Sequence, residues 1–305
     1  MAEWLYEAGI GECRAALVED GVIVEAHIEV PGLRAGTIAD ARLTTILVPG
    51  RRGIATLADG IEALIEPLPK VTEGGAIRIE ITRETIPEPG ALKRAKGRTS
   101  EADCCDGPDL SARIGPHRVV DRHGPDWLEQ AGWSECLEEA ARGITAFPGG
   151  TLRISLTPAM TLIDVDGDDV IAGARAAGRA IRRFGISGNI GIDLPTVAGK
   201  PERQAIAEAF DAVLPQPYER TAVNGFGFLQ IIRPRFRASL CETLHHDRVA
   251  ASARALIRRA QRSVKIGAAE ISASPKVIAA IECNPDWTDQ LSRQLGGPVS
   301  LRTVA

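Results

Sequence analysis

Two element patterns follow one another along this chain, and the change between them constrains the fold more than any other feature. Residues 1–86 contain short strand-like runs separated by turn signals at Asp20-Gly21, Pro49-Gly50 and Asp59-Gly60. Residues 127–305 instead alternate strand-like and helix-like segments. The first pattern predicts a small all-β unit and the second predicts a sheet with helices packed on it, so we expect an α/β protein with α+β elements.

The β-rich part is predicted to contain a hairpin and a barrel. Residues 1–33 are expected to form an N-terminal β-hairpin that packs on the core, and residues 34–86 an OB-fold-like barrel. A sandwich or a split sheet stays open, because periodicity alone does not choose between them. Residues 87–126 are rich in proline and glycine, and we interpret them as a linker or insert whose basic cluster is a solvated loop.

The alternating part divides into a mixed α/β domain over residues 127–247 and a C-terminal helical and strand subdomain over 248–305. Its predicted helices are Trp127–Arg142, Val170–Phe184, Pro201–Val213, Arg248–Arg262 and Pro275–Cys283. Its predicted strands are Thr151–Leu156, Met160–Val165, Gly188–Leu194 and Val223–Arg233.

Composition excludes several classes of protein. The 305 residues are 44% hydrophobic and 25% charged with a formal charge of −4, which argues against disorder and against a uniformly basic nucleic-acid coat. No apolar run approaches the roughly 20 residues of a membrane helix, and Glu3 and Glu7 stand where a signal peptide has basic residues. Six cysteines without a Cys-x-x-Cys spacing suggest reduced thiols. We therefore expect a cytoplasmic protein with no membrane partner.

Carboxylates follow two of the predicted strands. Asp164 and Asp166 are two residues apart, so on a strand they project to the same face, and Asp193 ends another apolar run. If these strands are parallel neighbours, Asp164 and Asp193 meet at one edge of the sheet, where paired carboxylates suit Mg²⁺. The alternative is structural, with Asp164 capping a strand and the following acids forming a turn. An EF-hand is excluded because apolar residues stand where it needs oxygen ligands.

Three segments of the chain contain motifs whose order and spacing carry further information. The first is Gly149-Gly-Thr-Leu-Arg-Ile-Ser-Leu-Thr-Pro-Ala-Met-Thr-Leu-Ile-Asp164-Val-Asp166, the second Gly188-Asn-Ile-Gly-Ile-Asp193-Leu, and the third Val223-Asn-Gly-Phe-Gly-Phe-Leu-Gln-Ile-Ile-Arg233-Pro-Arg235. In motif, order and spacing they resemble the catalytic part of the RNase E/G endoribonuclease family. The resemblance implies an S1-type OB-fold followed by an RNase H-like and DNase I-like core.

The resemblance also implies a chemistry. Asp164 and Asp193 would hold a catalytic Mg²⁺, with Mn²⁺ as an alternative, and Asp166 stands at the family's asparagine as a third catalytic residue. The implied activity is cleavage of single-stranded RNA by metal-activated water, leaving 5′-phosphate and 3′-hydroxyl ends. The family's Cys-Pro-x-Cys zinc link is replaced after His246 by Asp247-Arg-Val-Ala-Ala, so no zinc is expected. The family's 5′-sensor segment is absent as well, which makes this a reduced member and leaves a homo-oligomer open.

Basic residues supply the expected RNA contacts. Residues 230–265 contain nine Lys or Arg and two acids, a net +7 within an acidic chain. Arg233, Arg235 and Arg237 would alternate on one strand face, with Arg182 and Arg183 on the preceding helix. Arginines 258, 259 and 262 fit a solvated helix face, and Phe226, Phe228 and Phe236 fit the core better than base stacking. Two alternatives remain: an RNA-binding protein of the same fold that has lost turnover, and a protein–protein adaptor.

Overall fold

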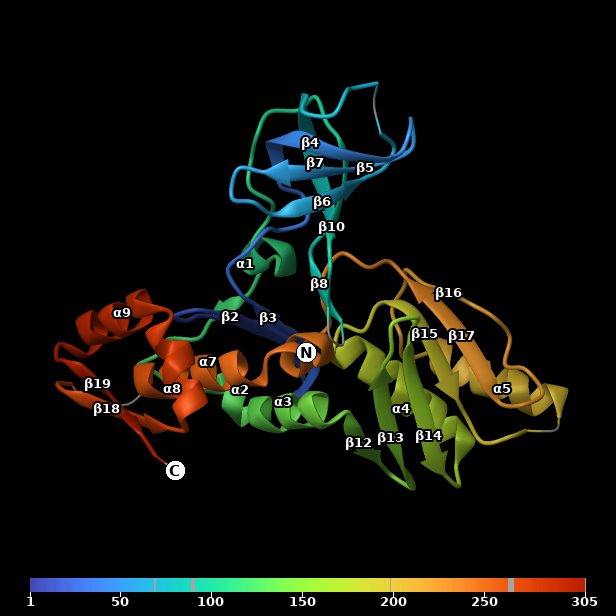
Figure 1. The fold of residues 1–305 in the computed structure, drawn as a ribbon. Coiled ribbons are helices and arrows are strands. Elements are labelled where there is room, and N and C mark those ends of the chain that lie inside the picture. The colour runs from blue at the N-terminus through green and yellow to red at the C-terminus, as the bar shows by residue number, and fades with distance from the viewer. Residues whose placement is uncertain (69, 89–90, 198, 263–265, 305) are drawn as a thin grey trace.

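The computed structural model describes residues 1–305 except 69, 89–90, 198, 263–265 and 305. It is a mixed α+β protein in which a closed barrel stands above a larger body (Figure 1).

The barrel is built from five strands in the order β10-β6-β5-β4-β7. They are β4 (Ile38–Val48), β5 (Arg52–Leu57), β6 (Glu62–Ile65), β7 (Ala76–Arg83) and β10 (Ala95–Thr99). Alternate residues point inward, and Leu43, Ile65, Ile79 and Ile81 form a core separate from the rest of the protein. β10 pairs parallel with β6 and antiparallel with β7, which closes the cylinder. This closed five-stranded barrel is compatible with the predicted OB-like part.

The barrel takes its closing strand from the segment interpreted as a linker or insert. That segment also holds the paired strands β8 (Ile86–Glu88) and β9 (Ala91–Lys93), the short helix α1 (Leu110–Ile114) and β11 (Arg118–Val119). Turn density in the sequence predicted loose structure here, but the turns connect short elements: β10 completes the barrel and β11 completes the N-terminal sheet described next. The basic cluster predicted to be a solvated loop lies mostly on strands, with Lys93 in β9 and Lys96 and Arg98 in β10.

The N-terminal sheet has the order β11-β1-β2-β3. Its strands are β1 (Glu3–Ala8), β2 (Cys13–Glu19) and β3 (Val22–Glu29), with β11 parallel to β1. Asp20 and Gly21 both have positive φ, as a two-residue hairpin turn requires. Leu5, Ala16 and Ile23 belong to the same hydrophobic core as the larger sheet described next, so these strands pack on the main body.

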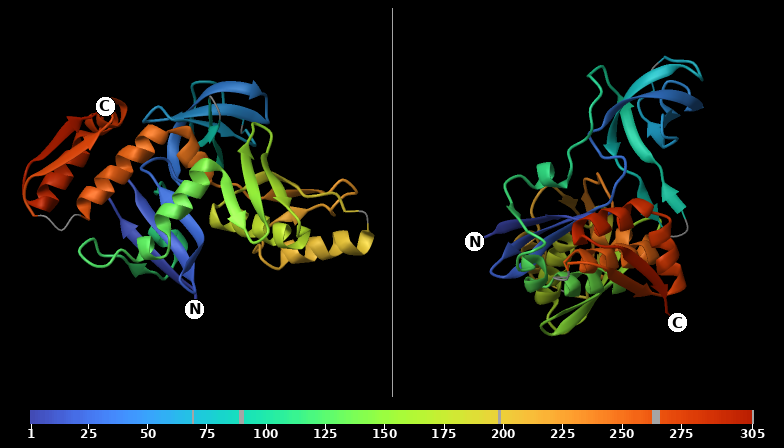
Figure 2. Two further views of the ribbon diagram at one scale, coloured as in Figure 1. Left: turned by 90° about the horizontal axis from the view of Figure 1, so that it is seen from below. Right: turned by 90° about the vertical axis from the view of Figure 1, so that its left-hand side faces the viewer.

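A six-stranded sheet of order β12-β13-β14-β15-β17-β16 forms the centre of the main body. Its strands are β12 (Ile144–Phe147), β13 (Gly150–Leu156), β14 (Thr161–Gly167), β15 (Gly188–Asp193), β16 (Glu219–Arg220) and β17 (Phe228–Arg233). The long helices α4 (Val170–Arg183) and α5 (Lys200–Asp211) cover one face (Figure 2). Ile163 and Ile192 point to these helices and are fully buried, while their strand neighbours face the other side.

Three further helices join the main body: α2 (Trp127–Gln130), α3 (Trp133–Arg142) and α6 (Leu240–His246). The single helix predicted over Trp127–Arg142 is wrong, because Gly132 takes a left-handed conformation (φ 90°) that interrupts it and caps α3. The predicted strand over Val223–Arg233 is likewise too long. Asn224 accepts hydrogen bonds from the backbone N–H groups of Phe226 and Phe228 and makes a turn there, so β17 begins only at Phe228.

The C-terminal part has its own small core. It consists of α7 (Arg248–Gln261), β18 (Ala269–Ala273), α8 (Pro275–Glu282), α9 (Pro285–Leu295) and β19 (Val299–Thr303), with β18 and β19 parallel. Ile257, Ile281 and Leu291 fill this core together with Ile10 from the N-terminal part. No described helix is long and apolar enough to cross a membrane.

Candidate active site and nucleic-acid interface

The two strands that carry the predicted metal ligands are parallel neighbours. β14 pairs with β15 so that Asp164 lies directly opposite Asp193. Neighbouring strands are about 4.8 Å apart, so the two side chains leave the backbone side by side. The condition on which the predicted convergence depended is therefore met.

One face of each of the two strands is buried, so the carboxylates on the opposite face point toward solvent. Ile163 and Val165 flank Asp164 in β14 and turn inward, and Ile192 does the same beside Asp193. Because side chains alternate, Asp164, Asp166 and Asp193 share the face that α4 and α5 leave uncovered. Asp164 is half-buried, whereas Asp193 and Asp166 are exposed. We call these three residues the acidic row.

Two neighbours of the acidic row could not be recognised as such from the sequence alone. Arg153 on β13 lies opposite Asp164, and its Nε is 3.5 Å from Asp166 Oδ2. Phe228 lies opposite Asp193 on the other side, and its ring covers Gly191, where a Cβ atom would come within 2.7 Å of it. The alternation of β13 indicated that Arg153 faces outward, but only the strand order reveals which acid it meets.

The donor set of the acidic row suits a hydrated oxygen-seeking cation. Mg²⁺ commonly uses one or two carboxylates, keeps several waters, and takes further oxygens from a substrate phosphate. Asp164 and Asp193 offer two carboxylates on an open face with room for such waters. Within the described residues no group of three or more His, Cys, Asp or Glu side chains is arranged to hold a metal ion.

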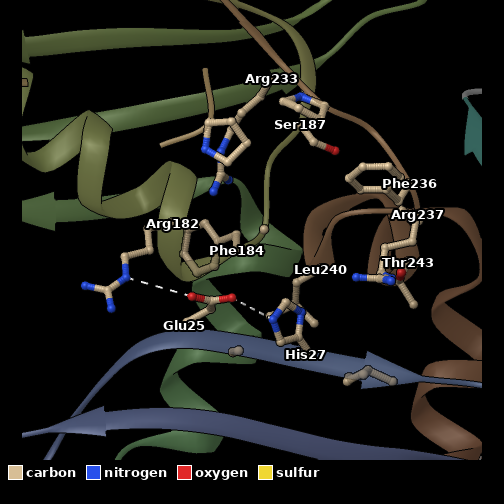
Figure 3. Close-up of a pocket in the computed structure, with 16 residues that line it drawn as sticks. Glu25, His27, Arg182, Phe184, Ser187, Arg233, Phe236, Arg237, Leu240 and Thr243 are labelled. Carbon is tan, nitrogen blue, oxygen red and sulfur yellow. Dashed lines mark hydrogen bonds and ion pairs between the residues drawn. The ribbon is translucent and has the colours of Figure 1, made fainter. Parts of the chain in front are cut away.

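Three of the five arginines predicted to contact RNA were expected to alternate on one strand face, and the structure does not place them there. β17 ends at Arg233, so Arg235 and Arg237 lie in the following loop and the predicted alternation of the three is wrong. Arg235 pairs with Glu242, and Arg183 pairs with Glu139 at 2.8 Å. The other three, Arg182, Arg233 and Arg237, line one cavity (Figure 3).

The basic surface predicted over residues 230–265 is largely neutralised. Arg254 and Arg258 of α7 both pair with Glu12, which is 5% exposed. Arg262 pairs with Glu7 and lies 2.9 Å from Asp126. The interpretation as a solvated helix face is therefore wrong for Arg258 and Arg262, whose side chains are 13% and 12% exposed and pair with acids more than a hundred residues away. It holds for Arg259, which is exposed.

Two of the three phenylalanines expected in the core are on the surface. Phe226 is 83% exposed and Phe236 is 53% exposed. Phe226 lies in the turn before β17 and Phe236 in the loop after it, so neither occupies an inward strand position. Phe228 is partly buried on the open face beside Asp193.

Comparison with known proteins identifies no family for this chain. A scan against protein-family models finds no match, and no curated protein is significantly similar to the chain.

Proposed function

We propose that the protein is a Mg²⁺-dependent endoribonuclease that cleaves single-stranded RNA on the open face of the six-stranded sheet, as a reduced member of the RNase E/G family. The observation that carries the proposal is the parallel register of β14 and β15, with Asp164 opposite Asp193 on an exposed face. Two carboxylates held at strand spacing repel each other unless a cation lies between them, so a divalent ion is the natural partner.

Asp164 and Asp193 would hold the metal, and Mn²⁺ would fit the same oxygen donors. A bound Mg²⁺ supplies Lewis-acid polarisation of the scissile phosphate and a water of lowered pKa. Asp166, two residues along the same strand face, would accept hydrogen bonds from water bound at the row, because an ionised carboxylate is an acceptor only. Arg153 approaches this row and offers a guanidinium to phosphate oxygens as negative charge builds on them.

The surroundings of the row fit a single-stranded chain. Phe228 presents part of its ring next to Asp193, where an unstacked base could pack on it. The strand order of the barrel fits the S1-type OB-fold that the resemblance implies, and such barrels bind oligonucleotides. The six cysteines, none of them among the undescribed residues, are free thiols, which supports a location in the cytoplasm.

The test is cleavage of an end-labelled single-stranded RNA with and without Mg²⁺. Asp164→Asn and Asp193→Asn should each lower the rate ~100-fold or more, because each removes a charged oxygen ligand without changing side-chain size. Asp168→Asn is the matched control, since Asp168 is exposed in the turn after β14 and lies off the row. Equal rates for the wild type and both row variants would refute the proposal.

Measuring binding of the same RNA, alongside its cleavage, tests the alternative of an RNA-binding protein without turnover. Binding that weakens steeply with salt, with no Mg²⁺-dependent products, would support it. A Mn²⁺ titration separates the two further, because a binding protein without a metal site shows no loss of Mn²⁺ affinity on Asp164→Asn.

A further inference from the structure

A cavity of about 190 Å³ lies at the opposite end of β15 from Asp193. Its walls come from β3, the end of α4, the loop after β17 and α6. Arg182, Arg233 and Arg237 bring three guanidinium groups to it, and Glu25 and His27 form its floor (Figure 3). Its volume is more than ten times what a single water requires.

Positive charge dominates the lining. Glu25 is the one acid on the described wall, against three arginines. Its carboxylate is already engaged, because His27 Nε2 is 2.9 Å from one oxygen and Arg182 Nε is 3.8 Å from the other (Figure 3). These neighbours lower the pKa of Glu25 despite its burial, so it stays ionised. Behind the wall, Arg182 also pairs with Glu19 at 3.0 Å and Arg237 lies 3.7 Å from Glu84. Among the described residues, Arg233 is therefore the arginine of the lining that has no carboxylate paired with it.

Two donors in this cavity lack acceptors, although Arg182 also donates to Glu19 and Arg233 donates to the Ile186 carbonyl. The Nε atoms of Arg182 and Arg237 are buried and have no hydrogen-bond partner among the described residues. Their closest carboxylates are 3.8 and 3.7 Å away, too far for a hydrogen bond. Burial also lowers the pKa of the Arg233 guanidinium, and Arg182 lowers it further. A cavity lined by three guanidinium groups, with two buried N–H donors that lack partners and one arginine without a paired carboxylate, suits an anion with several oxygens.

The rim adds a flat apolar surface and hydroxyls. Phe236 lines the cavity and is 53% exposed, and Ser187 and Thr243 place hydroxyl groups beside it. A phosphate matches the guanidinium and hydroxyl groups, and a base matches the ring. We propose that this cavity binds one nucleotide unit, with its phosphate on Arg233 and Arg237 and its base stacked on Phe236.

This inference deepens the proposed RNA binding and rests on it only for the source of the nucleotide. Arg233 lies opposite Gly188 at the start of β15, while Asp193 ends that strand, about 17 Å away at 3.3 Å per residue. The nucleotide site is therefore separate from the acidic row, and either can exist without the other.

Calorimetric titration of the full chain tests the proposal with adenosine 5′-monophosphate, inorganic phosphate and adenosine. We expect saturable binding of the monophosphate, weaker binding of phosphate, and none of adenosine. Arg233→Met and Arg237→Met should each weaken binding of the monophosphate at least tenfold, since each removes a charged donor. Arg175→Met, an exposed arginine of α4 outside the cavity, should leave it unchanged.

Phe236→Leu keeps the test decisive if an arginine variant fails to fold, because Phe236 is exposed. It should weaken the monophosphate by about tenfold, the low end of measured stacking effects, and leave phosphate unchanged. Asp193→Asn should leave the affinities for the monophosphate and for phosphate unchanged, so loss of cleavage and loss of this site are told apart. Competition by a short single-stranded RNA identifies RNA as the source, and binding without competition identifies a free nucleotide. No binding of the monophosphate up to about 10 mM, or equal losses in Arg175→Met, would overturn the inference.

Discussion

Glu12 holds the C-terminal helix α7 to the N-terminal sheet, and its replacement tests whether the basic residues of α7 are structural. Its carboxylate accepts hydrogen bonds from Arg254, at 3.1 Å, and from Arg258. Glu12 is 5% exposed, and the side chains of Arg254 and Arg258 are 11% and 13% exposed. Glu12→Gln keeps the side-chain size but turns an NH₂ group toward one guanidinium and leaves two buried positive charges without a counter-charge.

The expected cost follows from these contacts. A hydrogen bond to a charged group contributes about 1.5–3 kcal/mol, and Glu12 accepts two. Removing one partner from a buried ion pair costs about 3–5 kcal/mol, which agrees with that sum. We therefore expect Glu12→Gln to lower the free energy of unfolding by about 3–5 kcal/mol.

Urea unfolding followed by tryptophan fluorescence measures this loss. Trp287 is a suitable reporter, because it packs against Gly11 next to Glu12. Glu138→Gln is the control, since Glu138 forms an exposed pair with Arg142 one helical turn along α3 and should lose only about 0.3–0.5 kcal/mol. A loss below about 1 kcal/mol for Glu12→Gln would refute the reasoning, because the pair would then behave like a surface one.

Two further predictions concern a buried thiol and a crowded glycine. Burial raises the pKa of Cys136 to about 11, so at pH 8 only about one Cys136 thiol in a thousand is ionised. Iodoacetamide should therefore modify the exposed Cys283 in the native protein and reach Cys136 only after unfolding. Peptide mass spectrometry would detect both modifications. Gly150→Ala would drive its methyl group into the carbonyl oxygen of Asp166, so calorimetry should show a stability loss of about 1–3 kcal/mol, whereas Gly32→Ala, with open space around it, should show almost none.

Much of the fold could be predicted because its signals are local. The strands of the barrel and the central sheet follow period-2 alternation, and the Asp20-Gly21 turn has the residues that positive φ requires. The outward direction of Asp164 and Asp166 came from the same alternation. What alternation cannot supply is strand order, so Arg153 and Phe228 were not connected with the acids they face.

The basic residues were misjudged for a different reason. A local net charge adds up only residues that are close together in the sequence. Glu12 pairs with Arg254 across 242 positions, and Glu84, next to the barrel, pairs with Arg237. An ion pair of that kind leaves no trace in local composition. Part of the positive charge over residues 230–265, that of Arg254, Arg258 and Arg262, therefore serves to attach α7 to the N-terminal part of the chain.

An arginine–carboxylate pair also explains how the acidic row accommodates Asp166. An aspartate at position 166, where the resembled family has asparagine, adds a negative charge beside Asp164. Arg153 lies 3.5 Å from it, so the formal charge of the three acids and this arginine is −2, the value that Asp164 and Asp193 would carry alone. Arg153 and Asp166 are 60% and 64% exposed, and a pair so exposed contributes at most about 1 kcal/mol. Arg153 therefore offsets the extra charge without locking Asp166 in place, and the guanidinium can exchange that carboxylate for a phosphate at little cost.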